Sequence, residues 1–126
     1  MEISFNRLSP LYKFLQEVRQ EKIPTTVAFK FYKLFKAAEE NVTFFQEEYA
    51  KLLKEFAQTD ENGQFKYTDD GAILIQEGRV QECANQIDKL NKETAQMPDI
   101  KFTEVELETI PGITIEILEI LEPFMA

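Results

Sequence analysis

The stretch between positions 22 and 38 combines lysines with aromatic residues and holds no acidic residue. Lysines beside stacking aromatic rings can hold an anionic ligand such as a nucleotide. The residues that would form this patch are Phe29, Lys30, Tyr32, Lys33 and Lys36. Core packing, together with docking of the acidic C-terminal tail on these lysines, is the competing interpretation, and we favour it. The absence of arginine here and the acidic balance of the chain argue against general nucleic-acid binding.

Two sets of glutamates near the C-terminus carry the opposite charge. One set alternates along a segment that we expect to be extended, and the other recurs every three residues along an expected helix, so each set shares one face. These residues are Glu104, Glu106, Glu108, Glu116, Glu119 and Glu122. Solvated faces are the simplest interpretation. The alternative is an acidic surface that contacts a basic partner in the way that nucleic-acid phosphates do.

Other chemistry finds little support in the sequence. The chain has no histidine, and its single Cys83 lies on an apolar helical seam, which indicates a small buried hydrophobe. The segment that begins at Asp60 is similar to the opening of a calcium loop, but Phe65 holds the required glycine position and Gly71 that of the bidentate glutamate. The glycines form no phosphate-binding loop. We therefore expect no catalytic residue, no cofactor and no metal, and hence a protein that is not an enzyme.

Length and charge limit the architecture further. The chain has 126 residues, 44% of them hydrophobic, and a net charge of -9. This supports one folded domain over residues 1–126. The charge is uneven: residues 1–58 carry a net +1, residues 59–97 a net -4 and residues 98–126 a net -6. No basic-then-apolar leader and no long apolar run occur, so we expect a soluble intracellular protein without a membrane segment.

The helices that must position these residues are indicated by capping residues and periodicity. Ser9 and Pro10 predict a helix over 10–21. A second helix over 25–57, capped by Thr25 or Thr26, has a heptad seam with one irregularity between Ala38 and Val42. At roughly 50 Å it would be longer than a compact domain of this size. It either breaks near 41–43 or projects and pairs with another chain, and the sequence leaves both alternatives open.

The rest of the chain adds smaller elements. A short hairpin is expected within 59–76 and a third helix over 77–97, with the seam Val80, Cys83, Ile87, Leu90, Thr94 and Met97. An extended strand over 99–109 and a short helix capped by Thr114 would complete the acidic 98–126 segment. The predicted fold is mainly α with a small β element (α+β): an antiparallel helical hairpin or three-helix bundle with one long heptad-patterned helix and a short C-terminal helix.

The layout resembles the DUF1617 family of small bacteriophage proteins over nearly the whole chain. The likeness rests on the long helix, the third helix and four segments: Leu11-Tyr12-Lys13-Phe14-Leu15, Asp60-Glu61-Asn62-Gly63, Ile100-Lys101-Phe102 and the closing residues 113–124. The resemblance implies a phage or prophage origin and the cytoplasm of a bacterial host, with virion association as a further option. It brings no assigned activity to residues of this chain.

Three hypotheses for function follow. The leading one is a non-enzymatic phage-encoded interaction, assembly or accessory protein that binds a phage or host protein through its surface and forms a homo-oligomer through the long helix. The second is an inhibitor of a host defence or nucleic-acid-handling enzyme that acts through the acidic C-terminal face. The third is a binder of a nucleotide or another small anionic ligand at the lysine and aromatic patch.

Overall fold

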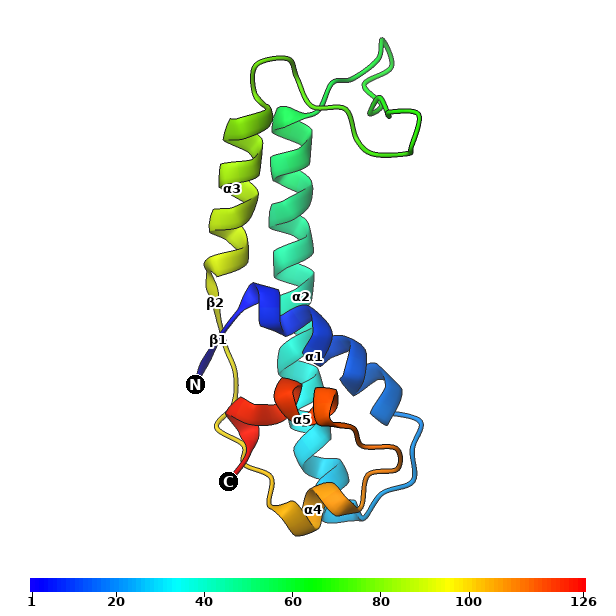
Figure 1. Cartoon of the computed structure of the whole chain (residues 1–126), viewed down its shortest axis with the longest axis vertical. Coiled ribbons are helices and arrows are strands. Elements are labelled where there is room, and N and C mark those ends of the chain that lie inside the picture. Colours follow the sequence, from blue (N-terminus) through cyan, green and yellow to red (C-terminus); the bar gives the residue numbers. More distant parts are fainter. The chain divides into compact units, whose positions relative to one another are not determined.

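The computed structural model describes all residues 1–126 and is mainly helical, with one long helix and a small antiparallel sheet (Figure 1). This confirms the predicted fold class. The elements are β1 (Glu2–Ser4), α1 (Phe5–Val18), α2 (Thr25–Phe56), α3 (Val80–Lys92), β2 (Thr94–Gln96), α4 (Glu104–Glu108), α5 (Ile115–Leu121) and the 3-10 helix η1 (Glu122–Phe124).

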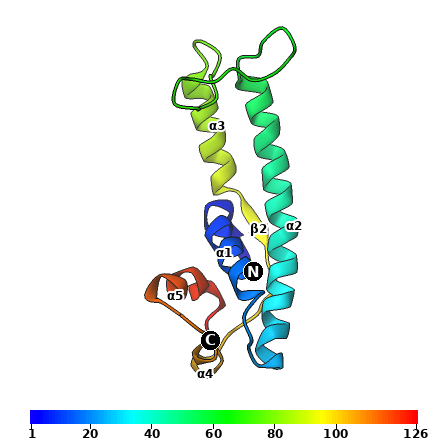
Figure 2. The same cartoon turned by 90° about the vertical axis from the view of Figure 1, so that its right-hand side faces the viewer.

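The chain divides into two compact units. The first unit comprises Met1–Thr43 and Glu93–Ala126, and the second unit comprises Phe44–Lys92. Helix α2 contributes its first part to one unit and its last part to the other. In the first unit, α1 lies across the first part of α2, and in the second unit α3 runs beside the last part of α2 (Figures 1 and 2).

The long helix α2 confirms the prediction for residues 25–57 almost to the residue, and it is not interrupted near 41–43. Asn41 fits into the helix because its amide donates to the Ala37 carbonyl oxygen at 2.9 Å and to the Gln96 carbonyl oxygen at 3.1 Å. The cap differs from the prediction: the Pro24 carbonyl accepts the first helical bond, from the Ala28 N–H at 2.9 Å. Thr25 is therefore the first helical residue.

Helix α1 begins five residues before the predicted start, so the assignment of Ser9 and Pro10 to the helix N-terminus is wrong. Pro10 lies inside the helix, where it removes one backbone hydrogen bond. Phe5 and Leu8 are both buried, and the Phe5 N–H donates to the Glu93 carbonyl oxygen at 2.9 Å. Burial of two large apolar side chains outweighs the loss of that bond.

The third helix is shorter than predicted, because α3 covers Val80–Lys92 rather than 77–97. Thr94 and Met97 of the predicted seam lie beyond it. Residues Thr94–Gln96 instead form β2, which pairs antiparallel with β1 and places Ile3 opposite Ala95. Both of these side chains are buried. This long-range strand pairing competes with helix extension and satisfies the backbone of both segments.

The predicted strand over 99–109 is wrong in its second half, which forms helix α4. Thr103 caps α4: its hydroxyl accepts from the Glu106 N–H at 3.2 Å, while the Glu106 carboxylate accepts from the Thr103 N–H at 3.0 Å. This reciprocal capping box satisfies two N–H groups that a helix start otherwise leaves open. Only Phe102 keeps a β-type pairing, a parallel bridge to Met125.

The predicted hairpin within 59–76 is present, although through isolated bridges rather than a continuous ladder. Tyr67 pairs antiparallel with Ile73, and the turn between them ends at Gly71 with φ +88°. Two backbone bonds join this hairpin to Gln58, which follows α2: Gln58 donates to Leu74 at 2.8 Å and accepts from Lys66 at 3.0 Å. A third bond, from Leu74 to Lys66 at 2.8 Å, lies within the hairpin. These bonds form a closed ring that fixes the tip of the second unit.

The core of the first unit is formed by α1, the first part of α2, and the C-terminal segment. The Phe31 ring stacks on Phe102 at a centroid distance of 4.5 Å and meets Phe14 edge-on at 6.1 Å. Leu121 and Phe124 are fully buried in this core. The buried apolar residues of the second unit are fewer and lie at its tip: Phe56, Ala57 and Cys83.

Candidate functional site

A cavity of about 330 Å³ opens between the end of α1 and the start of α2 in the first unit. Apolar side chains from both helices and from the connection between them form most of its lining. They are Leu15, Val18, Ile23, Ala28, Phe31 and Phe35. Arg19, Glu21, Tyr32 and Lys36 complete the lining. The cavity is therefore an apolar pocket with charged side chains among its lining residues.

A second cavity, of about 240 Å³, adjoins the first. It is lined by Thr25, Ala28, Phe29 and Tyr32, so the two cavities share Ala28 and Tyr32. Phe29 and Tyr32 are 62% and 59% exposed, although they are large and aromatic. Exposed aromatic side chains beside apolar pockets are typical of protein-binding surfaces. We call the two cavities together with Phe29, Tyr32, Arg19 and Lys36 the α1–α2 groove.

Two cations accompany the apolar surface of the groove. The Lys36 ammonium lies 5.9 Å from the centre of the Tyr32 ring, and the Arg19 guanidinium lies 4.8 Å from the centre of the Phe35 ring. Neither side chain takes part in any of the ion pairs of the chain. Glu21 is the one acidic residue in the lining. The groove therefore has a positive balance in a protein whose net charge is -9.

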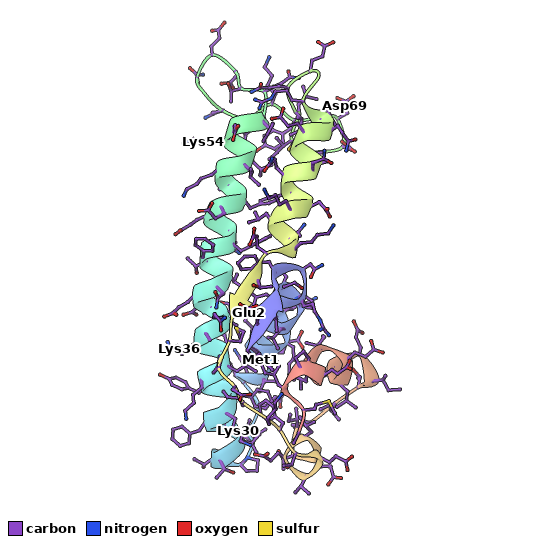
Figure 3. The ribbon with its side chains drawn as sticks, turned by 90° about the vertical axis from the view of Figure 1, so that its left-hand side faces the viewer. Met1, Glu2, Lys30, Lys36, Lys54 and Asp69 are labelled. Carbon is purple, nitrogen blue, oxygen red and sulfur yellow. The ribbon has the colours of Figure 1, made fainter.

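The structure divides the lysine and aromatic patch predicted from the sequence. Phe29, Tyr32 and Lys36 line the groove, whereas Lys33 is exposed and lines neither cavity. Lys30 is engaged elsewhere, although both Lys30 and Lys36 project from the first part of α2 (Figure 3). The sequence pattern does not reveal Arg19, because this residue directly follows α1 and only folding brings it beside the patch.

Lys30 connects α2 to the C-terminal segment of the first unit. Its ammonium donates to the Lys101 carbonyl oxygen at 2.7 Å and to Glu106 Oε1 at 2.8 Å, and lies 5.7 Å from the centre of the Phe102 ring. The acidic tail thus docks on the lysine segment at this residue, which agrees with the favoured interpretation. Lys30 is a structural contact here and lines neither cavity.

The glutamates do not form the faces predicted for them at residues 104–108. Because this segment is helical, Glu104 and Glu108 lie on one side of α4, while Glu106 turns toward Thr103 and Lys30. The correction follows from the capping box that replaces the expected strand. Glu116 and Glu119 lie on α5 and Glu122 begins η1, all three exposed.

Replacing Glu106 with glutamine is expected to reduce the loss of stability in acid. The Lys30 hydrogen bond, aided by the Thr103 N–H, lowers the pKa of the Glu106 carboxyl below its ordinary value of 4.5. A carboxyl with a lowered native pKa stabilises the fold above that ordinary value, and the stabilisation is lost as the pH falls through the native pKa. Between about pH 6 and about pH 3, wild type should lose more free energy of unfolding than Glu106→Gln.

Urea unfolding across that pH range measures this difference. Glutamine can still accept the Thr103 N–H, so the capping box is retained and the comparison isolates the charge. Glu104→Gln is the matched control, because Glu104 is exposed on the same helix. Parallel pH profiles for wild type and Glu106→Gln would contradict the role of the Lys30–Glu106 pair.

The single cysteine agrees with its prediction as a buried hydrophobe. Cys83 is buried, and burial raises the pKa of its thiol, which disfavours the reactive thiolate. No group of three or more cysteine, aspartate or glutamate side chains could hold a metal ion. None of the helices combines the length and apolar character needed to span a bilayer.

The chain matches no protein-family model, no curated protein and no solved structure. Its function must therefore be inferred from the geometry of its own residues.

Proposed function

We propose that this chain is a non-enzymatic interaction protein that binds a partner protein through the α1–α2 groove. The observation that carries the proposal is the exposure of Phe29 and Tyr32 at 62% and 59%, directly beside two apolar cavities. Exposing two aromatic rings to water is unfavourable, and a partner that covers them would recover the free energy of burial. The lining of the groove holds no serine, cysteine or histidine and only one carboxylate, that of Glu21, so its composition supports binding.

The composition of the groove supports a protein partner over a small anion. Aromatic residues and arginine are enriched where binding energy concentrates in protein interfaces. The six apolar lining residues of the larger cavity are better suited to apolar side chains than to phosphate groups. Lys30, which the nucleotide hypothesis needs, is held by Glu106 and the Lys101 carbonyl.

The setting that we propose follows from the resemblance to phage proteins. The chain would act as an assembly or accessory factor in the cytoplasm of a bacterial host, with association to the virion as one outcome of assembly. Self-association through α2 is part of the proposal, because the seam residues Tyr49 and Leu52 in the second unit are only half-buried. A helix seam with this pattern can pack against another helix.

A second function is favoured by a different observation on the C-terminal segment. Val105 and Ile115 are 72% and 77% exposed and lie among the exposed glutamates of α4 and α5. Apolar side chains within an acidic surface could contact a basic enzyme, as the inhibitor hypothesis requires. This acidic face and the α1–α2 groove therefore compete as the contact surface.

Site-specific photo-crosslinking in the bacterial host separates the two surfaces. A photoreactive residue replaces Tyr32 in one variant, Ile115 in a second and Lys13 in a third; Lys13 is exposed on α1 and lines neither cavity. We expect a covalent adduct with one defined protein from position 32 only. An adduct from position 115 alone would support the inhibitor function instead. Adducts from neither position, or equal adducts from all three, would contradict binding through the groove.

A further inference from the structure

The form of the α1–α2 groove narrows the kind of partner that it accepts. We infer that its occupant is an acidic amphipathic helix of the partner protein, which places one large apolar side chain in each cavity and its acidic side chains near Arg19 and Lys36. This inference rests on the proposed function and specifies the chemistry of the partner.

The arrangement of the cavities favours a helix. The two cavities share the lining residues Ala28 and Tyr32, so they are immediate neighbours along α2. Apolar side chains three or four residues apart on a helix are also immediate neighbours, with their Cβ atoms about 5–6 Å apart. A helix with successive apolar anchors can therefore fill both cavities while Tyr32 packs between the anchors.

The charge of the groove favours acidic flanks on that helix. Arg19 and Lys36 contribute positive charge to the lining against the single Glu21, and neither cation has an ion-pair partner in the chain. No acidic residue occurs between Lys22 and Ala38. The rest of the protein is strongly acidic, so an acidic helix is repelled by most other surfaces. The groove is thus the surface whose positive charge is complementary to an acidic helix.

A synthetic peptide tests the inference without knowledge of the natural partner. The probe is a fluorescent helical peptide of about 14 residues, with leucines spaced three and four apart on one face and glutamates on the other. Its control is a twin in which lysines replace the glutamates. Fluorescence anisotropy should show the acidic peptide binding wild-type protein at least about tenfold more tightly than the lysine twin.

Variants of the protein locate the contact. Tyr32→Ala should weaken binding of the acidic peptide about tenfold or more, because Tyr32 would contact both anchors. Arg19→Glu combined with Lys36→Glu should reverse the preference, so that the lysine twin binds more tightly. Lys13→Glu makes the same type of charge change outside the groove and should leave the affinity within about twofold. Thermal unfolding checks that each variant is folded, and Lys36→Glu alone serves if the double variant unfolds.

Charge reversal is a sharper test than added salt. Salt screens the attraction at the groove, but it also screens the repulsion between an acidic peptide and a chain with net charge -9. These two effects oppose each other, so an affinity that changes little with salt would not distinguish attraction at the groove from its absence.

The outcomes separate this inference from the proposed function. Equal binding of both peptides, binding of neither, or acidic-peptide binding that survives Tyr32→Ala would overturn the acidic-helix inference. Displacement of the peptide by a nucleotide, or binding of a second copy of this chain in its place, would also overturn it in favour of that occupant. After any of the three peptide-binding outcomes named first, a defined crosslink at position 32 would still support the proposed function. The absence of that crosslink would count against the proposed function itself.

Discussion

Replacing Phe102 with alanine is expected to lower the free energy of unfolding of the first unit by about 3–5 kcal/mol. Phe102 is fully buried, and its ring stacks on Phe31 at 4.5 Å. Its backbone is held on both sides, since its N–H donates to Phe124 at 2.7 Å and its carbonyl accepts from Ala126 at 2.8 Å. The chain around it therefore cannot collapse freely, and alanine leaves a cavity in contact with Phe31. Urea unfolding followed by circular dichroism measures the loss.

The matched control for this change is Val105→Ala. Val105 lies three residues further along the chain and is 72% exposed, so removal of its methyl groups should change stability by no more than about 0.5 kcal/mol. A loss below about 1 kcal/mol for Phe102→Ala would show that the C-terminal segment does not pack on α2 in the way described.

Helix α2 was predictable from the sequence because several local signals agree there. The heptad spacing of apolar residues, the proline before its first residue and the absence of glycine within it all indicate the same element. Its seam is buried at Val27, Leu34 and Ala38, as the periodicity predicts. Where the local signals agree with one another, contacts with distant residues rarely change which element forms.

The errors fall where two local signals compete or where distant residues intervene. The sequence from Thr103 to Glu106 carries a capping-box pattern, which favours a helix, whereas the alternating residues from Ile100 to Glu108 favour the predicted strand. The start of α1 and the end of α3 depend on the pairing of β1 with β2, in which Ile3 lies opposite Ala95, 92 residues away. No local pattern near Pro10 or Thr94 reports that pairing.

The candidate site was predictable only in part, because residues distant in the sequence complete it. Phe29, Tyr32 and Lys36 share one face of α2, and a reader of the sequence can find them by helical spacing. Arg19 directly follows α1, and the apolar lining residues come from α1, from α2 and from the connection between them, so the groove exists only after the helices pack. Lys30 looks equivalent to Lys36 in the sequence, but Glu106, 76 residues away, engages it. A charge pattern on one helix does not show which lysine a distant carboxylate will pair with.

Replacing Phe56 with alanine is expected to open the second unit while the first unit remains folded. Phe56 is the largest fully buried side chain of the second unit, with the Arg79 guanidinium 4.2 Å from the centre of its ring. The Phe56 carbonyl also accepts from the Gln76 N–H at 2.8 Å, which ties the end of α2 to the chain before α3. Loss of the ring should cost about 3–5 kcal/mol, a large part of the stability of a unit with few other buried residues.

Hydrogen–deuterium exchange with peptide-level resolution measures this effect. Amides in 44–92 should exchange much faster in Phe56→Ala than in wild type, whereas amides in 1–43 and 93–126 should keep their protection. Val80→Ala is the control within the same unit, because Val80 is 62% exposed and should change exchange little. The decisive region is α2, which belongs to both units: protection should be lost after Thr43 and retained before it. Faster exchange spread evenly over the whole chain would instead establish one cooperative domain over residues 1–126, as the sequence alone predicts.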